Sequence, residues 1–263
     1  MSSVSRIARI ELVTADVAQA CYFYVQALGF ERVAGDGGHA VLRLGAEEIA
    51  LVHGPGVAAA YPEPAAANDP WFQHFAIAVS DASAAFERLL AHGATPISRG
   101  GPVALPASSG SVTAYKFRDP EGHPLELSQF PDDRWTRRRE AGALFLGVDH
   151  TAIAVADLEA SVRFYEELGL EVTFRGLNTG PTQDALDGLD GVSVDIVVLE
   201  VRGRAGPHLE LLHYRSPVRA AGRVIGSADV AATRIVFDAD VVESLSDPDG
   251  HRLELRVPAE GPP

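Results

Sequence analysis

The sequence predicts an α+β protein assembled from tandem βαβββ units, the fourth of which is shortened. Two observations lead to this prediction. An alternating apolar strand, an aspartate and an amphipathic helix recur three times along the 263 residues, and the later units each close on a Leu-Glu-Leu phrase. Internal repeats of this kind indicate one supersecondary unit used several times. We expect the units to span 5–56, 70–131, 145–216 and 228–257.

The helices of the first three units have recognisable start and stop signals. Each helix is expected to follow an aspartate, whose carboxylate accepts the free amide hydrogens of the first turn: Asp16, Asp81 and Asp157. Each is expected to end near a glycine, which tolerates a positive φ: Gly29, Gly93 and Gly169. The corresponding stretch of the fourth unit, AATRIVFDAD at 231–240, leaves almost no room for a helix.

The opening strands of units two and three begin with histidines that occupy the same place. His74 opens HFAIAV, and His150 opens HTAIAV 76 residues later. Successive side chains of a strand point to opposite faces, so each histidine shares its face with alanines and the bulky residues take the other face. Small residues around a histidine leave space, which indicates a cavity wall.

The closing strands place single carboxylates among leucines. Glu126 lies in PLELSQF and Glu210 in HLELLHY. A buried carboxylate is costly unless it is paired or bound to a cation. Two histidines and two glutamates would suit a divalent ion such as Zn, Ni, Co, Fe or Mn. His123 and His251, by contrast, lie in D-P-x-G-H turns and are expected to be structural.

The composition argues against several classes of partner. The formal charge of −14 disfavours nucleic acid and anionic membrane surfaces, and no apolar run is long enough to span a bilayer. Cys21 is the single cysteine and no signal peptide is evident, so we expect a cytoplasmic protein without an intrachain disulfide.

The paired βαβββ units, the H-x-A-I-A-V openings and the D-P-x-G-H-x-L-E-L endings resemble the vicinal oxygen chelate superfamily. This group includes glyoxalase I, methylmalonyl-CoA epimerase, extradiol dioxygenases, fosfomycin-resistance enzymes and bleomycin-binding proteins. The resemblance implies that two units pair into a cup-shaped mixed sheet, and that metal ligands come from the first and last strands of each unit. At the matching positions of this chain, the resemblance implies that His74, Glu126, His150 and Glu210 are the metal ligands and that Glu126 or Glu210 is the catalytic base.

Units one and four depart from the family pattern. Unit one has Arg9 and Ala50 at the ligand positions, while unit four has Thr233 at the histidine position and keeps Glu254. These losses favour nested pairing, two with three and one with four, over pairing in sequence order. In sequence, the units group into an N-terminal domain at 1–131, a linker at 132–144 and a C-terminal domain at 145–263.

The resemblance implies a metal-dependent lyase, isomerase or epimerase that acts by proton transfer on a small chelated substrate. The alternatives are an extradiol ring-cleavage dioxygenase and a metal-free binding protein of the bleomycin-resistance kind. Two polar loops, 105–115 and 175–188, are expected to supply substrate-binding residues: Ser108, Ser109, Tyr115, Asn178, Thr179 and Gln183. The chain is expected to be a monomer or a homodimer.

Overall fold

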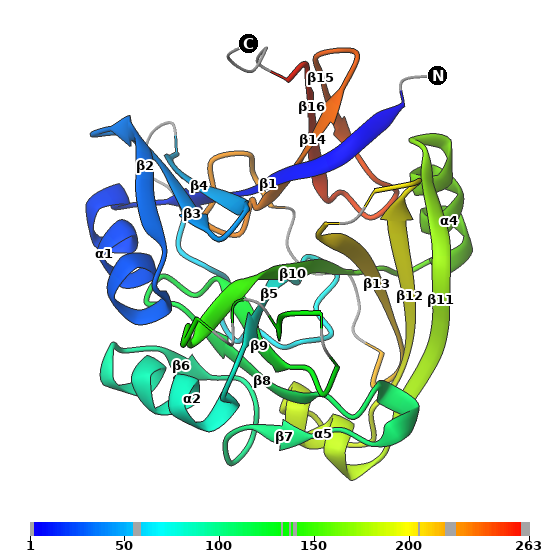
Figure 1. Ribbon diagram of the computed structural model, residues 1–263. Coiled ribbons are helices and arrows are strands. Elements are labelled where there is room, and N and C mark those ends of the chain that lie inside the picture. The colour runs from blue at the N-terminus through cyan, green and yellow to red at the C-terminus, as the bar shows by residue number, and fades with distance from the viewer. Residues whose placement is uncertain are drawn as a thin grey trace.

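Two mixed sheets lie face to face in the computed structural model, which describes residues 3–54, 59–132, 134–136, 138, 141–204, 206–218 and 225–258 (Figure 1). One sheet has 7 strands and the other has 9, and helices flank both. The predicted α+β class is confirmed. Among the described residues, no helix has the length and apolar character needed to cross a bilayer.

The 7-stranded sheet combines units one and four in the order β15-β16-β14-β1-β4-β3-β2. Unit one supplies β1 (Val4–Thr14), α1 (Val17–Leu28), β2 (Glu31–Asp36), β3 (His39–Leu44) and β4 (Glu47–His53). Unit four supplies β14 (Arg234–Ala239), β15 (Glu243–Ser246) and β16 (Arg252–Arg256). Residues 240–242 join β14 to β15 without a helix, so unit four is shortened as predicted.

The 9-stranded sheet combines units two and three in the order β11-β12-β13-β10-β5-β9-β8-β6, with β7 paired to β8. Unit two supplies β5 (Gln73–Val79), α2 (Ala82–Ala91), β6 (Thr95–Pro96), β7 (Val103–Ala104), the 3₁₀ turn η1 (Ala107–Ser109), β8 (Thr113–Arg118) and β9 (Pro124–Gln129). Unit three supplies β10 (Phe145–Ala154), α4 (Leu158–Glu167), β11 (Leu170–Thr179), α5 (Pro181–Asp187), β12 (Ser193–Val201) and β13 (His208–Ser216). The nested pairing is confirmed, and each sheet takes strands from both sides of residues 132–144.

The predicted helix signals hold in all three complete units. Asp16, Asp81 and Asp157 each accept a backbone hydrogen bond in the first turn of α1, α2 and α4. Gly29, Gly93 and Gly169 lie at or just after the ends of these helices and have positive φ values of 72°, 84° and 97°. These caps satisfy backbone groups that the helix itself leaves unpaired, and so fix where each helix begins and ends.

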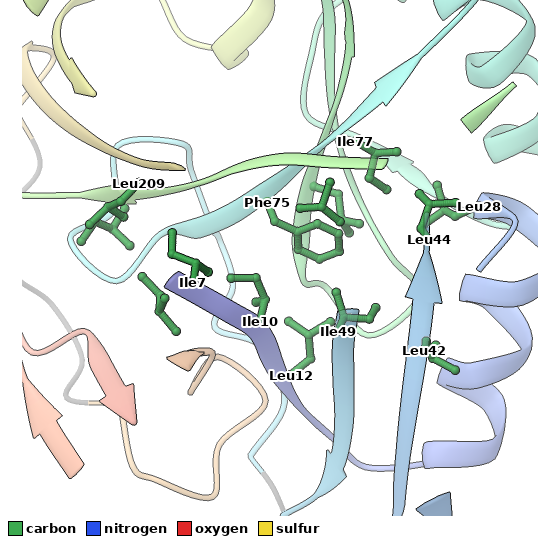
Figure 2. Close-up of a cluster of buried hydrophobic side chains, with 14 of the residues drawn as sticks. Ile7, Ile10, Leu12, Leu28, Leu42, Leu44, Ile49, Phe75, Ile77 and Leu209 are labelled. Atoms are coloured by element: carbon green, nitrogen blue, oxygen red, sulfur yellow. The ribbon is translucent and has the colours of Figure 1, made fainter. Parts of the chain in front are cut away.

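The main hydrophobic core fills the space between the sheets. Figure 2 shows Ile10 and Leu12 of β1 and Ile49 of β4 facing Phe75 and Ile77 of β5. These side chains alternate with residues that point away from the core, which is the period-2 pattern of a strand with one face buried. The core therefore occupies one face of each sheet and leaves the other face free for polar chemistry.

The two D-P-x-G-H turns connect units that follow each other in sequence. His123 Nε2 lies 2.9 Å from the Val13 carbonyl oxygen of β1, and His251 Nε2 lies 2.7 Å from the Ala154 carbonyl oxygen of β10. The turn aspartates accept hydrogen bonds from the Tyr24 and Tyr165 hydroxyls of α1 and α4. Buried hydrogen bonds thus tie unit two to unit one and unit four to unit three, as expected for structural histidines.

One predicted loop is wrong. Residues 175–188 were expected to form a polar loop, but they continue β11 to Thr179 and then form α5. Pro181 occupies the first turn of α5, where its missing N–H costs nothing, and Gly188 ends it with a φ of 67°. The prediction took Pro181 and Gly188 as signs of a loop, whereas they mark the start and the end of a short helix.

Candidate metal centre

Strand register brings the four predicted ligands to one face of the 9-stranded sheet. In the parallel pairs, Ala76 lies opposite Glu126 and Ala152 opposite Glu210, while antiparallel pairing sets His150 opposite Ala76. His74 and His150 each lie two residues before an alanine that faces a glutamate, so all four side chains project from the same face. Their neighbours Phe75, Ile77, Leu125 and Leu127 point into the core.

The four side chains form two adjacent histidine–glutamate pairs. His74 Nε2 lies 3.4 Å from Glu126 Oε2, and His150 Nε2 lies 3.8 Å from Glu210 Oε2. One ligand atom each of His74, Glu126 and His150 lies within 4.8 Å of the other two. Nitrogen and oxygen ligands held about 2.1 Å from one ion lie about 3.0 to 3.4 Å apart, so small side-chain adjustments suffice. The arrangement fits a divalent ion.

Burial and hydrogen bonding support the same conclusion. Both ring nitrogens of His74 are buried and neither makes a hydrogen bond of good geometry with a described residue; Nε2 has the 3.4 Å approach to Glu126 Oε2. An unpaired buried nitrogen is costly, and a metal ion would satisfy it. His150 is oriented differently: its Nδ1 lies 3.1 Å from Asp149 Oδ2, which directs Nε2 toward Glu210. A carboxylate behind a histidine in this way is typical of metal sites.

The electrostatics of the apo site separate the two histidines. Burial lowers the pKa of His74, in spite of the neighbouring Glu126. Burial also opposes charging of His150, but the Glu210 and Asp149 carboxylates outweigh it and raise its pKa to about 9. Burial would raise the pKa of Glu126, yet His74 and Lys116 lower it to about 2, and His150 lowers the pKa of Glu210 as well. Both glutamates are therefore ionised at neutral pH.

A cavity of about 620 Å³ opens beside these ligands. Deep in it, Lys116 of β8 lies next to Glu126, with 4.0 Å between Nζ and Oε2, and donates a 2.6 Å hydrogen bond to Asp187 of α5. A hydrogen-bonded series continues from this pair: Gln183 donates to Asp187, Asn178 to Gln183, and Ser109 to Asn178. The series links the candidate metal centre to both predicted substrate-binding segments.

The predicted substrate-binding residues divide into two groups. The cavity is lined by Ser108, Ser109, Asn178 and Gln183. Tyr115 lies elsewhere, since it neighbours Lys116 on β8 and so points to the opposite face, where it packs against Phe86 and Phe117. Thr179 is exposed and does not belong to the cavity lining. Placing 105–115 in one loop hid the strand alternation that buries Tyr115.

Sequence reasoning missed four residues of this site: Asp149, His208, Lys116 and Asp187. His208 lies beside Glu210, with 3.3 Å between Nε2 and Oε1, and its ring lies 5.2 Å from that of His150. It occupies the strand position two residues before Glu210, so alternation along β13 was a usable signal. Lys116 and Asp187 had no such signal, because their contact depends on how α5 docks onto β8.

The equivalent face of the 7-stranded sheet holds an ion-pair cluster instead. Val236 lies opposite Glu254, so by the register of the complete units Arg234 occupies the histidine position, and the assignment of Thr233 was one residue off. Arg9 occupies the other histidine position. Glu11 lies 3.3 Å from Arg9 and 3.0 Å from Arg234, so arginine–carboxylate pairs take the place of metal ligands there.

Comparisons with known proteins agree with this fold. A family model described as the Glyoxalase/Bleomycin resistance protein/Dioxygenase superfamily matches residues 6–127 and 147–245. No curated protein matches the sequence. Among solved structures, glyoxalase I from Zea mays has a TM-score of 0.63 at 19% identity, covering 95% of this chain and 91% of that one. A mutant of that enzyme has a TM-score of 0.66 at 19% identity, with the same coverage. A proposed dioxygenase from Bacillus subtilis has a TM-score of 0.56 at 16% identity, covering 97% and 86%.

Proposed function

The chain belongs to the Glyoxalase/Bleomycin resistance protein/Dioxygenase superfamily, and on this basis we propose that it is a metal-dependent lyase, isomerase or epimerase. It acts by proton transfer on a small substrate held through two neighbouring oxygens. The observation that carries the proposal is the buried cluster of His74, Glu126 and His150, with the partly buried Glu210 next to it, beside a cavity. Ionisable groups clustered in a cleft are candidates for binding or catalysis.

Each part of the site has a role in this reaction. The two histidines and two glutamates would hold a divalent ion, which when bound supplies a Lewis acid for the substrate's vicinal oxygens. Asp149 keeps Nε2 of His150 free to coordinate, because the Nδ1 hydrogen is engaged by the carboxylate. Apolar side chains of the cavity wall would limit the access of water to the reacting carbon.

Glu126 or Glu210 would take the proton from the carbon next to the chelated oxygen. Both are ionised at neutral pH and both face the cavity. Their surroundings differ: Glu126 accepts a 2.8 Å hydrogen bond from Ser128 and lies near Lys116, whereas Glu210 contacts His208. Whichever carboxylate acts as the base would have to weaken its contacts with these partners to reach the substrate carbon.

The test is exchange of carbon-bound hydrogen with solvent. Protein loaded with Co²⁺, Ni²⁺ or Zn²⁺ is incubated in D₂O with a panel of α-hydroxyketones and 2-oxoaldehyde–thiol adducts, and exchange is followed by ¹H NMR. We expect metal-dependent exchange that Glu126→Gln or Glu210→Gln abolishes while the bound metal remains. Exchange equal to that of metal-free protein across the panel would overturn the proposal.

One observation favours a second candidate, the ring-cleavage dioxygenase. The compact cluster of His74, His150 and Glu126 contains two histidines and one carboxylate, which is the ligand set of many non-haem iron oxygenases. Oxygen uptake by protein loaded anaerobically with Fe²⁺, measured with catechol, distinguishes the two reactions. Uptake that depends on both catechol and iron would favour the dioxygenase.

A further inference from the structure

The cations that line the cavity are already paired with carboxylates of the protein. Within the described part of the chain the lining contains two cationic side chains, Lys116 and Arg134. Lys116 Nζ lies 2.6 Å from Asp187, and both side chains are buried. Arg134 Nε lies 2.9 Å from Asp132, and its Nη1 lies 3.9 Å from Asp149. Lys116 is not available to a substrate without breaking a buried contact, whereas Arg134 is about half exposed at the edge of the cavity and is shared between two carboxylates.

The carboxylates of the lining leave no surplus of positive charge. Glu126 and Glu210 balance a divalent ion, and Asp149 is engaged by His150 and lies near Arg134. Glu200 adds a further negative charge from an exposed position in the lining. The charged groups that an anion would meet in this cavity are these carboxylates and cations already shared with carboxylates of the protein. The anion would lose its hydration without gaining a cationic partner of its own, which disfavours binding.

The remaining walls combine apolar side chains with the neutral hydroxyl and amide groups of Ser108, Ser109, Asn178 and Gln183, and both kinds of group suit an uncharged molecule. The apolar side chains come from β12, β13, α5 and the segments beside β8 and β9: Leu105, Val112, Phe130, Leu186, Val194, Ile196, Val198 and Leu212. Phe174 adds an aromatic side chain that is 49% exposed. The buried Tyr214 hydroxyl also lines the cavity, and burial raises its pKa so that it remains a neutral donor.

We infer that the substrate joins its two chelating oxygens to an uncharged, apolar body, and that carriers bearing carboxylate or phosphate groups are excluded. The inference rests on the proposed function, since the metal ion would hold the oxygens while the walls select the body. A cavity of about 620 Å³ lies within the range that encloses a small organic ligand. The selection is against charge rather than against size.

Two matched chelators test this selection. Benzohydroxamate and 4-carboxybenzohydroxamate present the same pair of vicinal oxygens, but the second carries an anionic body. Their dissociation constants are measured by calorimetry on full-length protein loaded with Co²⁺, and the visible Co²⁺ spectrum reports whether each one reaches the ion. We expect the carboxylated chelator to bind at least about tenfold more weakly, a difference of about 1.4 kcal/mol.

Equal or tighter binding of the carboxylated chelator would overturn the inference while leaving metal chelation intact. Failure of the protein to bind Co²⁺, or of both chelators to change its spectrum, would overturn the proposed function together with the inference. Asp187→Asn adds an independent check: it removes the partner of Lys116, so the preference for the uncharged chelator should shrink or reverse. If this variant does not fold, the wild-type ratio alone decides.

Discussion

The carboxylate behind His150 gives a sharp prediction for metal affinity. Asp149→Asn replaces a buried carboxylate, 7% exposed, whose Oδ2 lies 3.1 Å from His150 Nδ1. The amide keeps the shape of the side chain but removes the negative charge that orients the imidazole and raises its basicity. Loss of such a partner typically weakens metal binding about 10- to 100-fold, which corresponds to about 1.4 to 2.7 kcal/mol.

The assay must separate this effect from competition by protons. In the wild type a metal ion displaces a proton from His150, whose pKa is raised to about 9. Asp149→Asn lowers that pKa, so at neutral pH the weaker proton competition would mask part of the loss. Zn²⁺ affinity is therefore measured by competition with a chromophoric chelator above about pH 9, where His150 is neutral in both proteins.

A matched control separates the site from a general effect of removing a carboxylate. Asp195 also lies near a histidine, with 3.3 Å between its Oδ2 and His213 Nδ1, but it is not in the cavity lining. Asp195→Asn should leave the Zn²⁺ affinity unchanged within about twofold. If Asp149→Asn behaved like this control, His150 would not be the ligand that the Asp149 contact orients, and the reasoning would fail.

Three further predictions concern pH and stability. Apparent metal affinity should rise about tenfold per pH unit between pH 7 and 8 and level off above about pH 9, because His150 must lose its proton; metal titrations at fixed ionic strength measure this. Tyr165→Phe should lower the free energy of unfolding in urea by about 1.5 to 3 kcal/mol. Tyr24→Phe should lower it by less, because the Asp119 Oδ2 that Tyr24 contacts also has a hydrogen bond with His123 Nδ1; equal losses would contradict this. Lys116→Met should lower the free energy of unfolding by about 3 to 5 kcal/mol, because it leaves the buried Asp187 carboxylate without its cationic partner. The double variant Lys116→Met with Asp187→Leu should recover part of this loss. Thermal and urea unfolding measure both changes.

The repeat made most of the fold and the ligand set predictable. Two histidine-headed strands and two leucine-flanked glutamates, each at matching places, define one face of a sheet through the period-2 alternation of strands alone. The aspartate caps of the helices were predictable for a similar reason, since capping depends on residues within one turn. Nested pairing followed from where the ligand positions were lost, in units one and four.

The errors arose where the local signals are weak. Unit four lacks a helix, so it has no helix cap that would fix the register of its first strand, and the histidine position was placed at Thr233 instead of Arg234. The short helix α5 has no amphipathic repeat long enough to distinguish it from a loop. Tyr115 was placed in a loop although it lies in a strand.

The contact between Lys116 and Asp187 was beyond sequence reasoning for a different reason. These residues are 71 positions apart and lie in different units, so their approach depends on the packing of α5 against β8. Pairing of units two and three creates that contact, and no periodicity within either unit reports it. The selection against charged substrates therefore emerges only at the level of the assembled sheet.

The most direct test of the central claim is the metal content of the purified protein. Inductively coupled plasma mass spectrometry is applied to wild type, His74→Ala, His150→Ala and Glu254→Ala after equal exposure to Mn, Fe, Co, Ni and Zn and removal of unbound ions. Glu254 is the matched control, because it holds the glutamate position on the face where Arg9 and Arg234 replace the histidines. We predict about one equivalent of metal in the wild type and in Glu254→Ala, and its loss in both histidine variants. No bound metal in the wild type, or metal retained in both histidine variants, would contradict a metal centre at His74, Glu126, His150 and Glu210.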